Sequence, residues 1–190
     1  MERLAPIFNK LYTKFPYMGN LLFVDVETTG LEADARLIEI GAILTSYDGF
    51  DVSFDTFEIL INPGVQIVEI ITKITGITND ELVNAPKEEQ AYPIFMEWLK
   101  DKEITKCVAH NSQFDEGKLK YNLMRTVQAY PLPSFECTMR MSKQYLKGPK
   151  NDKLGTLAAW FNFVNSQAHR ALSDTETCAY IFGKISLGEY

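Results

Sequence analysis

The chain has 190 residues, of which 46% are hydrophobic and 12% aromatic, and its formal net charge is −6. This length and apolar content predict one globular domain with a full core and exclude a disordered chain. The acidic balance argues against a general basic coat for nonspecific nucleic-acid binding, and no apolar stretch reaches the roughly 18 residues that a membrane span requires.

Residues 1–19 predict a helix followed by a turn. Apolar side chains recur at helical spacing from Leu4 to Phe15, and Pro16 and Gly19 end the pattern. We expect this segment to be an extension that packs on a domain formed by residues 20–190. The alternative is that its apolar stripe docks on a partner.

Three strands are expected next, followed by strand and helix in alternation. The strand patterns lie at about 20–27, 36–46 and 53–61, with turn chemistry at Tyr47-Asp48-Gly49. Helical patterns and one more strand complete the chain, with the strand at 104–109 and the helices near 66–75, 87–99, 112–126, 138–146, 153–162 and 170–185. This order predicts an α/β or α+β layered fold with helices on both faces of a mixed sheet.

Two carboxylates end the first predicted strand. Asp25 and Glu27 follow the apolar run Leu21–Val24, which is typical of a strand buried on both faces. Residues two apart on a strand share a face, so both charges are expected side by side. Burying a lone carboxylate is costly or shifts its pKa, and a hard divalent cation would offset that cost. The alternative is an exposed strand end with two hydrated acids.

Asp115 is a third candidate acid. It follows Ala109-His110-Asn111, where a strand is expected to end and a helix to begin. This is the edge at which α/β sheets place their sites. Alternatively, Ser112 caps the helix and Asp115 only favours the helix dipole.

Asp174 and His169 lie at the start of the last predicted helix. Asp174 shares a stripe that is otherwise apolar, so its carboxylate needs a partner, and a metal ion would serve. Alternatively, Ser173 and Glu176 form a capping box and Asp174 is an exposed first-turn acid. The His169 imidazole is suited to take a proton from water near neutral pH, or is only a polar surface group. His110 is expected to be structural.

Five basic residues fall within 14 positions. They are opposed by one acid, Asp152, and comprise Arg140, Lys143, Lys147, Lys150 and Lys153. Such a segment either follows a phosphate backbone or forms a solvated helix face and loop. The sequence leaves both interpretations open.

The order and spacing of these motifs resemble the DEDDh branch of the DnaQ-like 3′→5′ exonucleases, which includes the proofreading epsilon subunit of bacterial DNA polymerase III. The resemblance runs from about residue 20 to 185 and is carried by Val24–Leu31, Leu37–Ala42, Thr75–Thr78, Ala109–Asn111, Phe114–Asp115, His169–Leu172 and Asp174. It implies an α/β, RNase H-like fold with a mixed five-stranded sheet. The sister branch carries a tyrosine at the position of Arg170, so the histidine branch fits.

The resemblance also implies the chemistry. Two divalent metal ions, Mg²⁺ or Mn²⁺, would be held by Asp25, Glu27, Asp115 and Asp174, with His169 as the general base. The expected activity releases 5′-mononucleotides from the 3′ end of single-stranded or frayed DNA, in proofreading or repair. Residues expected to meet the terminal nucleotide are Thr28, Thr29, Leu31, Asn111 and Phe114. The alternatives are an RNA-trimming exoribonuclease of the same family and a non-catalytic nucleic-acid-binding module on this fold.

Partners and compartment complete the expectations. We expect nucleic acid with a free 3′ end, DNA in preference to RNA, a DNA polymerase as a further partner, and no membrane. Charged residues near the N-terminus interrupt any signal-peptide pattern, and the three cysteines form neither a zinc pattern nor a disulfide framework. These features predict a reducing cytoplasm. The sequence carries no signal for the oligomeric state.

Overall fold

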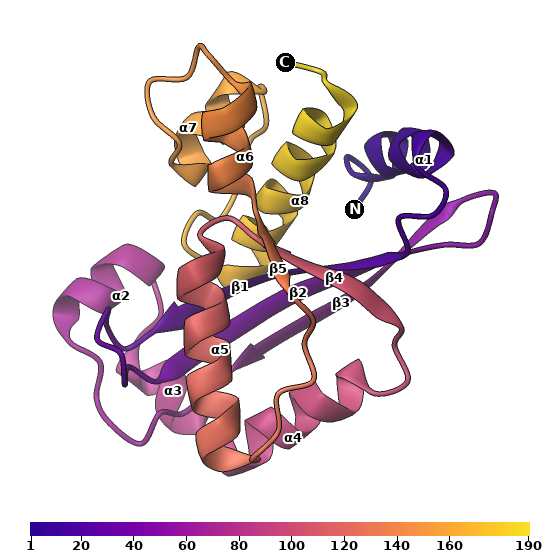
Figure 1. Cartoon of the computed structure of the whole chain (residues 1–190). Coiled ribbons are helices and arrows are strands. Elements are labelled where there is room, and N and C mark those ends of the chain that lie inside the picture. The colour runs from indigo at the N-terminus through magenta and orange to yellow at the C-terminus, as the bar shows by residue number, and fades with distance from the viewer.

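A five-stranded mixed sheet forms the centre of the computed structural model, which describes all residues 1–190 (Figure 1). The strands are β1 (Asn20–Thr28), β2 (Leu37–Tyr47), β3 (Val52–Leu60), β4 (Ile104–Ala109) and β5 (Phe135–Cys137). Their order across the sheet is β3-β2-β1-β4-β5, with β1 antiparallel to β2 and parallel to β4. The predicted α/β class and mixed sheet are confirmed, and β1 lies in the middle.

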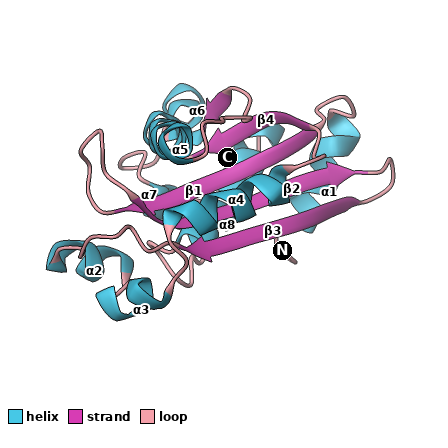
Figure 2. Cartoon of the chain, turned by 90° about the horizontal axis from the view of Figure 1, so that it is seen from below, coloured by secondary structure: helices cyan, strands magenta, loops and turns pink.

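Helices cover both faces of this sheet (Figures 1 and 2). They are α1 (Ala5–Lys14), α2 (Glu69–Thr75), α3 (Asn79–Asn84), α4 (Glu88–Leu99), α5 (Ser112–Thr126), α6 (Thr138–Tyr145), α7 (Leu154–Trp160) and α8 (Ala171–Leu187). α1 and α8 pack on one face, α4 and α5 on the other, and α6 and α7 pack against α8. No helix is both long and apolar enough to cross a membrane.

Alternate residues of β1 build two separate cores. Leu22, Val24 and Val26 belong to the apolar cluster that includes α4 and α5. Leu21 and Phe23 belong to the cluster with α1 and α8, where the Phe23 ring meets two phenylalanine rings edge-on. Because strand residues two apart share a face, positions 25 and 27 continue the face that is directed toward α8.

The predicted elements between residues 20 and 185 match the structure to within three residues at each end. Two elements were missed. α3 is a six-residue helix that begins with a capping box between Thr78 and Glu81. β5 has only three residues and exists through its parallel pairing with β4, a contact that no local pattern encodes.

The N-terminal helix is held by the rest of the chain. Leu4, Phe8, Leu11 and Tyr12 are buried in the cluster with β1 and α8, and the ring of Tyr12 stacks on that of Tyr47 with centroids 5.1 Å apart. Most of the apolar stripe that would dock on a partner is thus covered internally, and Phe15 at its end is exposed. The division into an extension, 1–19, and a domain, 20–190, stays a prediction.

The start of α8 lies directly on β2 at Gly41. A Cβ atom at this position would lie 2.2 Å from the amide nitrogen of Leu172 and 2.3 Å from the carbonyl carbon of Ala171. The hydroxyl of Thr175 donates a hydrogen bond to the carbonyl oxygen of Gly41 at 3.0 Å. Only glycine permits this approach, which brings the first turn of α8 against the centre of the sheet.

We therefore expect Gly41→Ala to lower the free energy of unfolding by about 1–3 kcal/mol, because the added methyl group overpacks this contact. Urea denaturation followed by circular dichroism measures the change.

Gly117 provides the matched control. It is exposed within α5, and a Cβ atom there would meet nothing within 4 Å. Gly117→Ala should raise the free energy of unfolding by about 0.4–1 kcal/mol, since alanine restricts the unfolded chain. Equal stability of the two variants would contradict the packing argument.

Candidate active site

Two acids of the central strand start the site. Asp25 and Glu27 are half-buried at the carboxyl end of β1, on the face directed toward α8. Across the antiparallel pairing with β2, Asp25 lies opposite Gly41 and Glu27 lies opposite Glu39. The close approach of α8 at Gly41 therefore brings that helix next to both acids.

Asp115 enters from the first turn of α5. This helix begins with Ser112 after Asn111 in the N-cap position, and no side chain caps it. The alternative in which Ser112 is the cap is therefore wrong, because the helix begins one residue earlier than a Ser112 cap requires. Asp115 is only 3% exposed, so it lies inside the molecule and is not a solvated first-turn acid.

Asp174 lies in the first turn of α8 and is 8% exposed. The capping-box alternative is wrong, because Arg170 occupies the N-cap position and the hydroxyl of Ser173 donates to Asn165 at 2.6 Å. The side-chain amide of Asn165 donates to Asp174 Oδ1 at 2.5 Å, and the backbone amide of His169 donates to Asp174 Oδ2 at 3.2 Å. Asp174 is thus fixed from two sides by the segment that precedes its helix.

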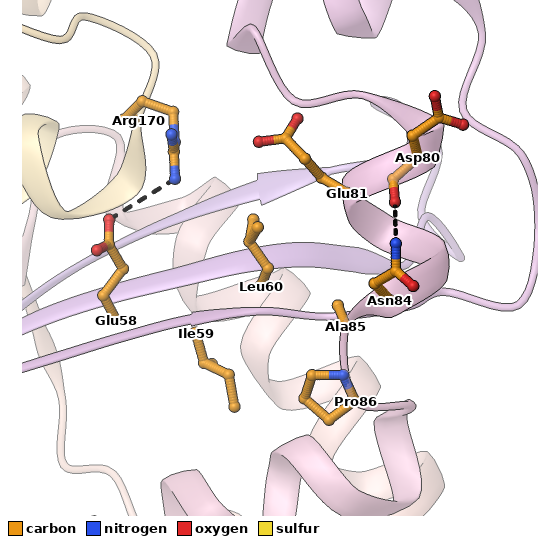
Figure 3. Close-up of a pocket in the computed structure, with 9 residues that line it drawn as sticks. All are labelled: Glu58, Ile59, Leu60, Asp80, Glu81, Asn84, Ala85, Pro86 and Arg170. Carbon is orange, nitrogen blue, oxygen red and sulfur yellow. Dashed lines mark hydrogen bonds and ion pairs between the residues drawn. The ribbon is translucent and has the colours of Figure 1, made fainter.

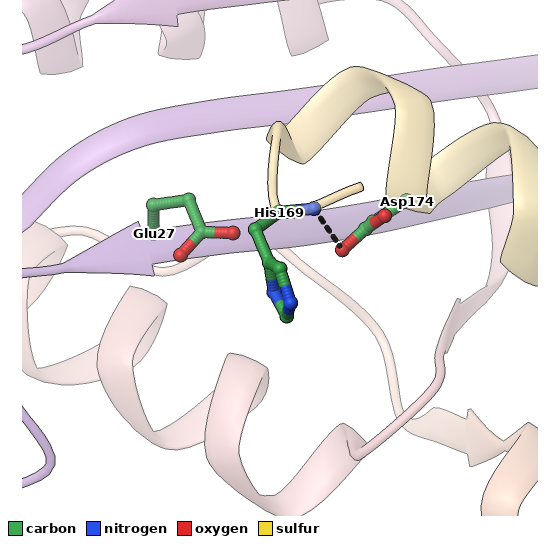
Figure 4. Close-up of side chains that lie close together, drawn as sticks. All are labelled: Glu27, His169 and Asp174. Carbon is green, nitrogen blue, oxygen red and sulfur yellow. Dashed lines mark hydrogen bonds between the residues drawn. The ribbon is translucent and has the colours of Figure 1, made fainter. Parts of the chain in front are cut away.

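His169 completes the cluster from an unusual backbone conformation. Its φ of +64° lies in the left-handed region, which non-glycine residues adopt at an energetic cost. Ligand atoms of Glu27, His169 and Asp174 all lie within 4.8 Å of one another (Figure 4). Since His169 is exposed while Asp174 is buried, the imidazole forms the solvent side of the cluster.

Burial raises the pKa values of all four carboxyl groups and is the largest cause in each, and nearby negative charge adds to the shift. The pKa of Asp25 rises well above its usual value, with further contributions from the charges of Asp115, Glu27 and Asp174. Burial and then the charge of Asp174 raise the pKa of Glu27 to about 8, and burial raises that of Asp115 to about 7. The pKa of Asp174 is also raised, although two hydrogen bonds oppose the shift. The four groups therefore form one electrostatic unit.

The four site acids differ from the buried acids Glu39 and Glu88 in lacking a cation. Glu39 accepts from Arg170, and Glu88 pairs with Arg36 and Arg125. No lysine or arginine lies within ion-pair distance of any of the four site carboxylates. A buried carboxylate without a partner is strongly disfavoured. A cluster of carboxylate oxygens with no protein cation fits hard divalent ions, which prefer oxygen ligands.

Glu39 and Arg170 form an anchor that sequence reasoning missed. Glu39 is fully buried and accepts from Arg170 Nε at 2.9 Å, from Arg170 Nη2 at 2.6 Å and from the amide of Ala171 at 2.7 Å. These bonds tie β2 to the first residue of α8. A glutamate inside the apolar run Leu37–Ala42 was the available signal, whereas nothing in the sequence marked Asn165.

Arg170 also faces a surface pocket beside the site. The pocket is lined by three acids, Glu58, Asp80 and Glu81, and Arg170 lies 3.9 Å from Glu58 (Figure 3). This side of the site is therefore rich in negative charge.

The residues expected to meet a nucleotide occupy varied positions. The hydroxyl of Thr28 donates to the carbonyl oxygen of Gly30 at 2.6 Å, and that of Thr29 accepts from the amide of Arg36 at 3.1 Å. Leu31 is 83% exposed, Asn111 is exposed, and Phe114 is half-buried against the core. Their contact with substrate stays a prediction, and for the two threonines it would come from the backbone.

The comparisons with known proteins agree with this geometry. Residues 22–182 match the RNase T family, described as an exonuclease. The DNA polymerase III subunit epsilon of Aquifex aeolicus is 32% identical over 169 residues, which cover 88% of this chain and 80% of that protein. The PolC-type DNA polymerase III of Caldanaerobacter subterraneus subsp. tengcongensis is 35% identical over 171 residues, 88% of this chain but 12% of that protein. The chain thus spans about an eighth of this relative's length.

Solved structures share the fold. The nuclease domain of 3′hExo, a DEDDh family member bound to rAMP, superposes with a TM-score of 0.76 at 18% identity, covering 90% of this chain and 94% of that one. Exonuclease I of E. coli in complex with a dT13 oligonucleotide gives a TM-score of 0.73 at 18% identity, covering 87% of this chain and 40% of that one. At this identity the likeness establishes the RNase H-like fold.

We expect Mn²⁺ or Mg²⁺ to raise the melting temperature of the wild-type protein, because a cation bound only by the folded site stabilises it. Asp25→Asn should lose most of this increment while being at least as stable as the wild type without metal, since it removes a buried carboxyl from a repulsive cluster. Thermal denaturation in EDTA and in a metal titration measures both. Glu97→Gln, an exposed change of equal charge on α4, should keep the full increment.

The anchor predicts a second pair of variants. Glu39→Ala and Glu88→Ala each remove a buried, arginine-paired glutamate and should each lower the free energy of unfolding by about 2–3 kcal/mol. Only Glu39→Ala should also weaken the metal-dependent stabilisation, because Glu39 fixes the helix that carries Asp174. Equal metal responses in the two variants would contradict a role of Glu39 in shaping the site.

Proposed function

This chain belongs to the DnaQ-like (DEDDh) exonuclease family, and we propose that it is a 3′→5′ exonuclease that releases 5′-mononucleotides from the 3′ end of DNA. One observation carries the proposal. Four carboxylates from three separate elements converge without a protein cation, beside an exposed imidazole. This arrangement suits hydrolysis of a phosphodiester by a metal-assisted mechanism.

Each site residue has a proposed role. Asp25, Glu27, Asp115 and Asp174 would hold two divalent cations, Mg²⁺ or Mn²⁺, since about four negative charges are offset by two such ions. When bound, these cations would stabilise the attacking and leaving oxygens of the phosphodiester. The imidazole of His169 takes a proton from the attacking water and passes it to solvent, which its exposed position permits. The hydrogen bond from the His169 amide to Asp174 holds the general base and this carboxylate next to each other.

The terminal nucleotide is proposed to lie between the end of β1 and the start of α5. The backbone at Thr28 and Thr29 would meet its sugar, and Asn111 offers a further polar contact. Leu31 and Phe114 would contact its base, since apolar and aromatic side chains bind bases with little sequence preference.

DNA is favoured over RNA by the relatives with the higher identity. The proteins at 32% and 35% identity are named as components of DNA polymerase III, whereas the rAMP-bound exonuclease shares only 18%. We therefore propose a role in DNA replication or repair with a DNA polymerase as a partner, which would place the protein in the cytoplasm. RNA trimming is the second candidate, supported by that rAMP complex.

The test is digestion of a 5′-labelled, single-stranded oligonucleotide with Mg²⁺ or Mn²⁺. We expect stepwise shortening from the 3′ end, arrest by EDTA, and slower cleavage of a 3′-blocked strand. Asp25→Asn should lower kcat at least ~10³-fold, because an essential charge is removed. His169→Ala should lower kcat while the metal-dependent rise in melting temperature persists.

The controls separate the alternatives. Glu97→Gln should digest DNA at the wild-type rate. A labelled RNA of the same sequence competes in one reaction, and faster loss of RNA would favour the exoribonuclease. An oligonucleotide that binds but stays intact with either metal would point to a non-catalytic binding module.

A further inference from the structure

The basic segment, residues 140–153, comprises most of α6, the loop after it and the N-cap of α7. Its five cations are all exposed, and none lies within ion-pair distance of a carboxylate; they are Arg140, Lys143, Lys147, Lys150 and Lys153. Lysines elsewhere on this acidic protein commonly pair, as Lys100 does with Glu97 and Lys106 with Glu136. The segment is therefore a concentrated, uncompensated positive charge.

The one acid in the segment does not offset this charge. Asp152 is half-buried, and its Oδ1 accepts a hydrogen bond from the hydroxyl of Ser142 at 2.6 Å. The carboxylate is therefore bound to Ser142 within the segment and pairs with no lysine.

The segment is attached to the edge of the candidate active site through His110. This residue directly follows β4 and precedes the first turn of α5, which carries Asp115. Its Nε2 lies 2.8 Å from the carbonyl oxygen of Asp152, and its Nδ1 lies 2.9 Å from the hydroxyl of Thr138. Burial lowers the pKa of His110 to about 4, so the ring is neutral, Nε2–H donates to Asp152, and Nδ1 accepts from Thr138.

Packing holds the loop of the segment in one place. The Trp160 ring lies against Gly148, where an added Cβ atom would be 2.1 Å from the ring. Leu146 packs against the apolar cluster formed by α7 and α8. The cations are therefore presented from a fixed backbone, which reduces the entropy lost when they bind a ligand.

We propose that the basic segment binds the internucleotide phosphates of the single strand whose 3′ end enters the acidic site. This inference rests on the proposed nuclease function. It adds the position of the part of the strand that lies outside the acidic site. The strand could leave the site toward the basic segment or toward the pocket at Arg170. That pocket is lined by Glu58, Asp80 and Glu81, whose negative charges repel phosphates, so the side of the basic segment is favoured (Figure 3). The strand that the site shortens would thus be held through the phosphates that precede the scissile one.

The test combines Lys147→Gln, Lys150→Gln and Lys153→Gln in one variant and compares two substrates, a 20-nucleotide DNA strand and a dinucleotide. For the 20-mer we expect KM to rise at least ~10-fold at low salt, with kcat unchanged. The slope of log KM against log salt should fall by about 2, since each phosphate contact on a single strand contributes roughly 0.7. Cleavage of the dinucleotide should be unchanged, because its single internucleotide phosphate is the scissile one, which the acidic site would hold.

A matched triple variant controls for net charge. Lys10→Gln, Lys14→Gln and Lys100→Gln change the charge equally on α1 and at the end of α4, away from the carboxyl end of β1 (Figure 1). It should keep the wild-type KM and salt dependence. An equal effect of both triple variants on the 20-mer would overturn the proposal, and so would a loss of dinucleotide cleavage in the basic-segment variant alone.

Binding without cleavage separates this inference from the nuclease function. Fluorescence anisotropy of a labelled 20-mer in EDTA should show a Kd raised at least ~10-fold by the basic-segment variant. If the wild type cleaves no oligonucleotide but this shift occurs, the nuclease proposal fails while the strand-binding site stands. If the wild type digests the 20-mer and the variant keeps the wild-type Kd and KM, the strand-binding proposal fails alone.

Discussion

The repulsion among four carboxylates at the carboxyl end of β1 is the constraint on which the rest of the structure depends. Burial and neighbouring charge both oppose ionisation of Asp25, Glu27, Asp115 and Asp174, as their raised pKa values show. Such a cluster weakens the metal-free fold, so the stabilising interactions must come from other residues. Proteins commonly tolerate this conflict between stability and chemistry only at functional sites.

The stabilising contacts lie around the four carboxylates and do not neutralise their charges. β1 has an apolar core on each face, and those cores fix the strand that carries the first two acids. Gly41 lets α8 approach the sheet, and Glu39 holds the first residue of that helix through Arg170 and the Ala171 amide. Arg170 thus neutralises Glu39, and its charge also lowers the pKa of Glu27 slightly against the stronger causes that raise it. One ion pair therefore positions the site without supplying its missing cation.

The sequence allowed prediction of much of this arrangement because the decisive signals are local. A charge inside an apolar strand pattern or on an apolar helix stripe can be read directly, and that is how Asp25 and Asp174 were found. What it missed depends on contacts that no local sequence pattern encodes. β5 exists only beside β4, the partner of Glu39 lies 131 residues away, and Asn165 reaches Asp174 through a turn that has no motif. The helix-cap alternatives at Ser112 and Ser173 were wrong because Asn111 and Arg170 occupy the N-cap positions of these helices.

The charge distribution also bears on how an acidic protein approaches a polyanion. A net charge of −6, together with four site carboxylates and an acidic pocket, repels a nucleic acid at long range. Two divalent cations held at the site would only offset its four carboxylates, so they would add no net attraction away from the scissile end. The basic segment supplies positive charge on a fixed backbone. His110, at the end of β4, connects this segment to the start of α5, which carries Asp115. Recognition of the strand and chemistry at its end would then use separate charges on one rigid frame, so that affinity for the polymer does not require cations inside the catalytic cluster.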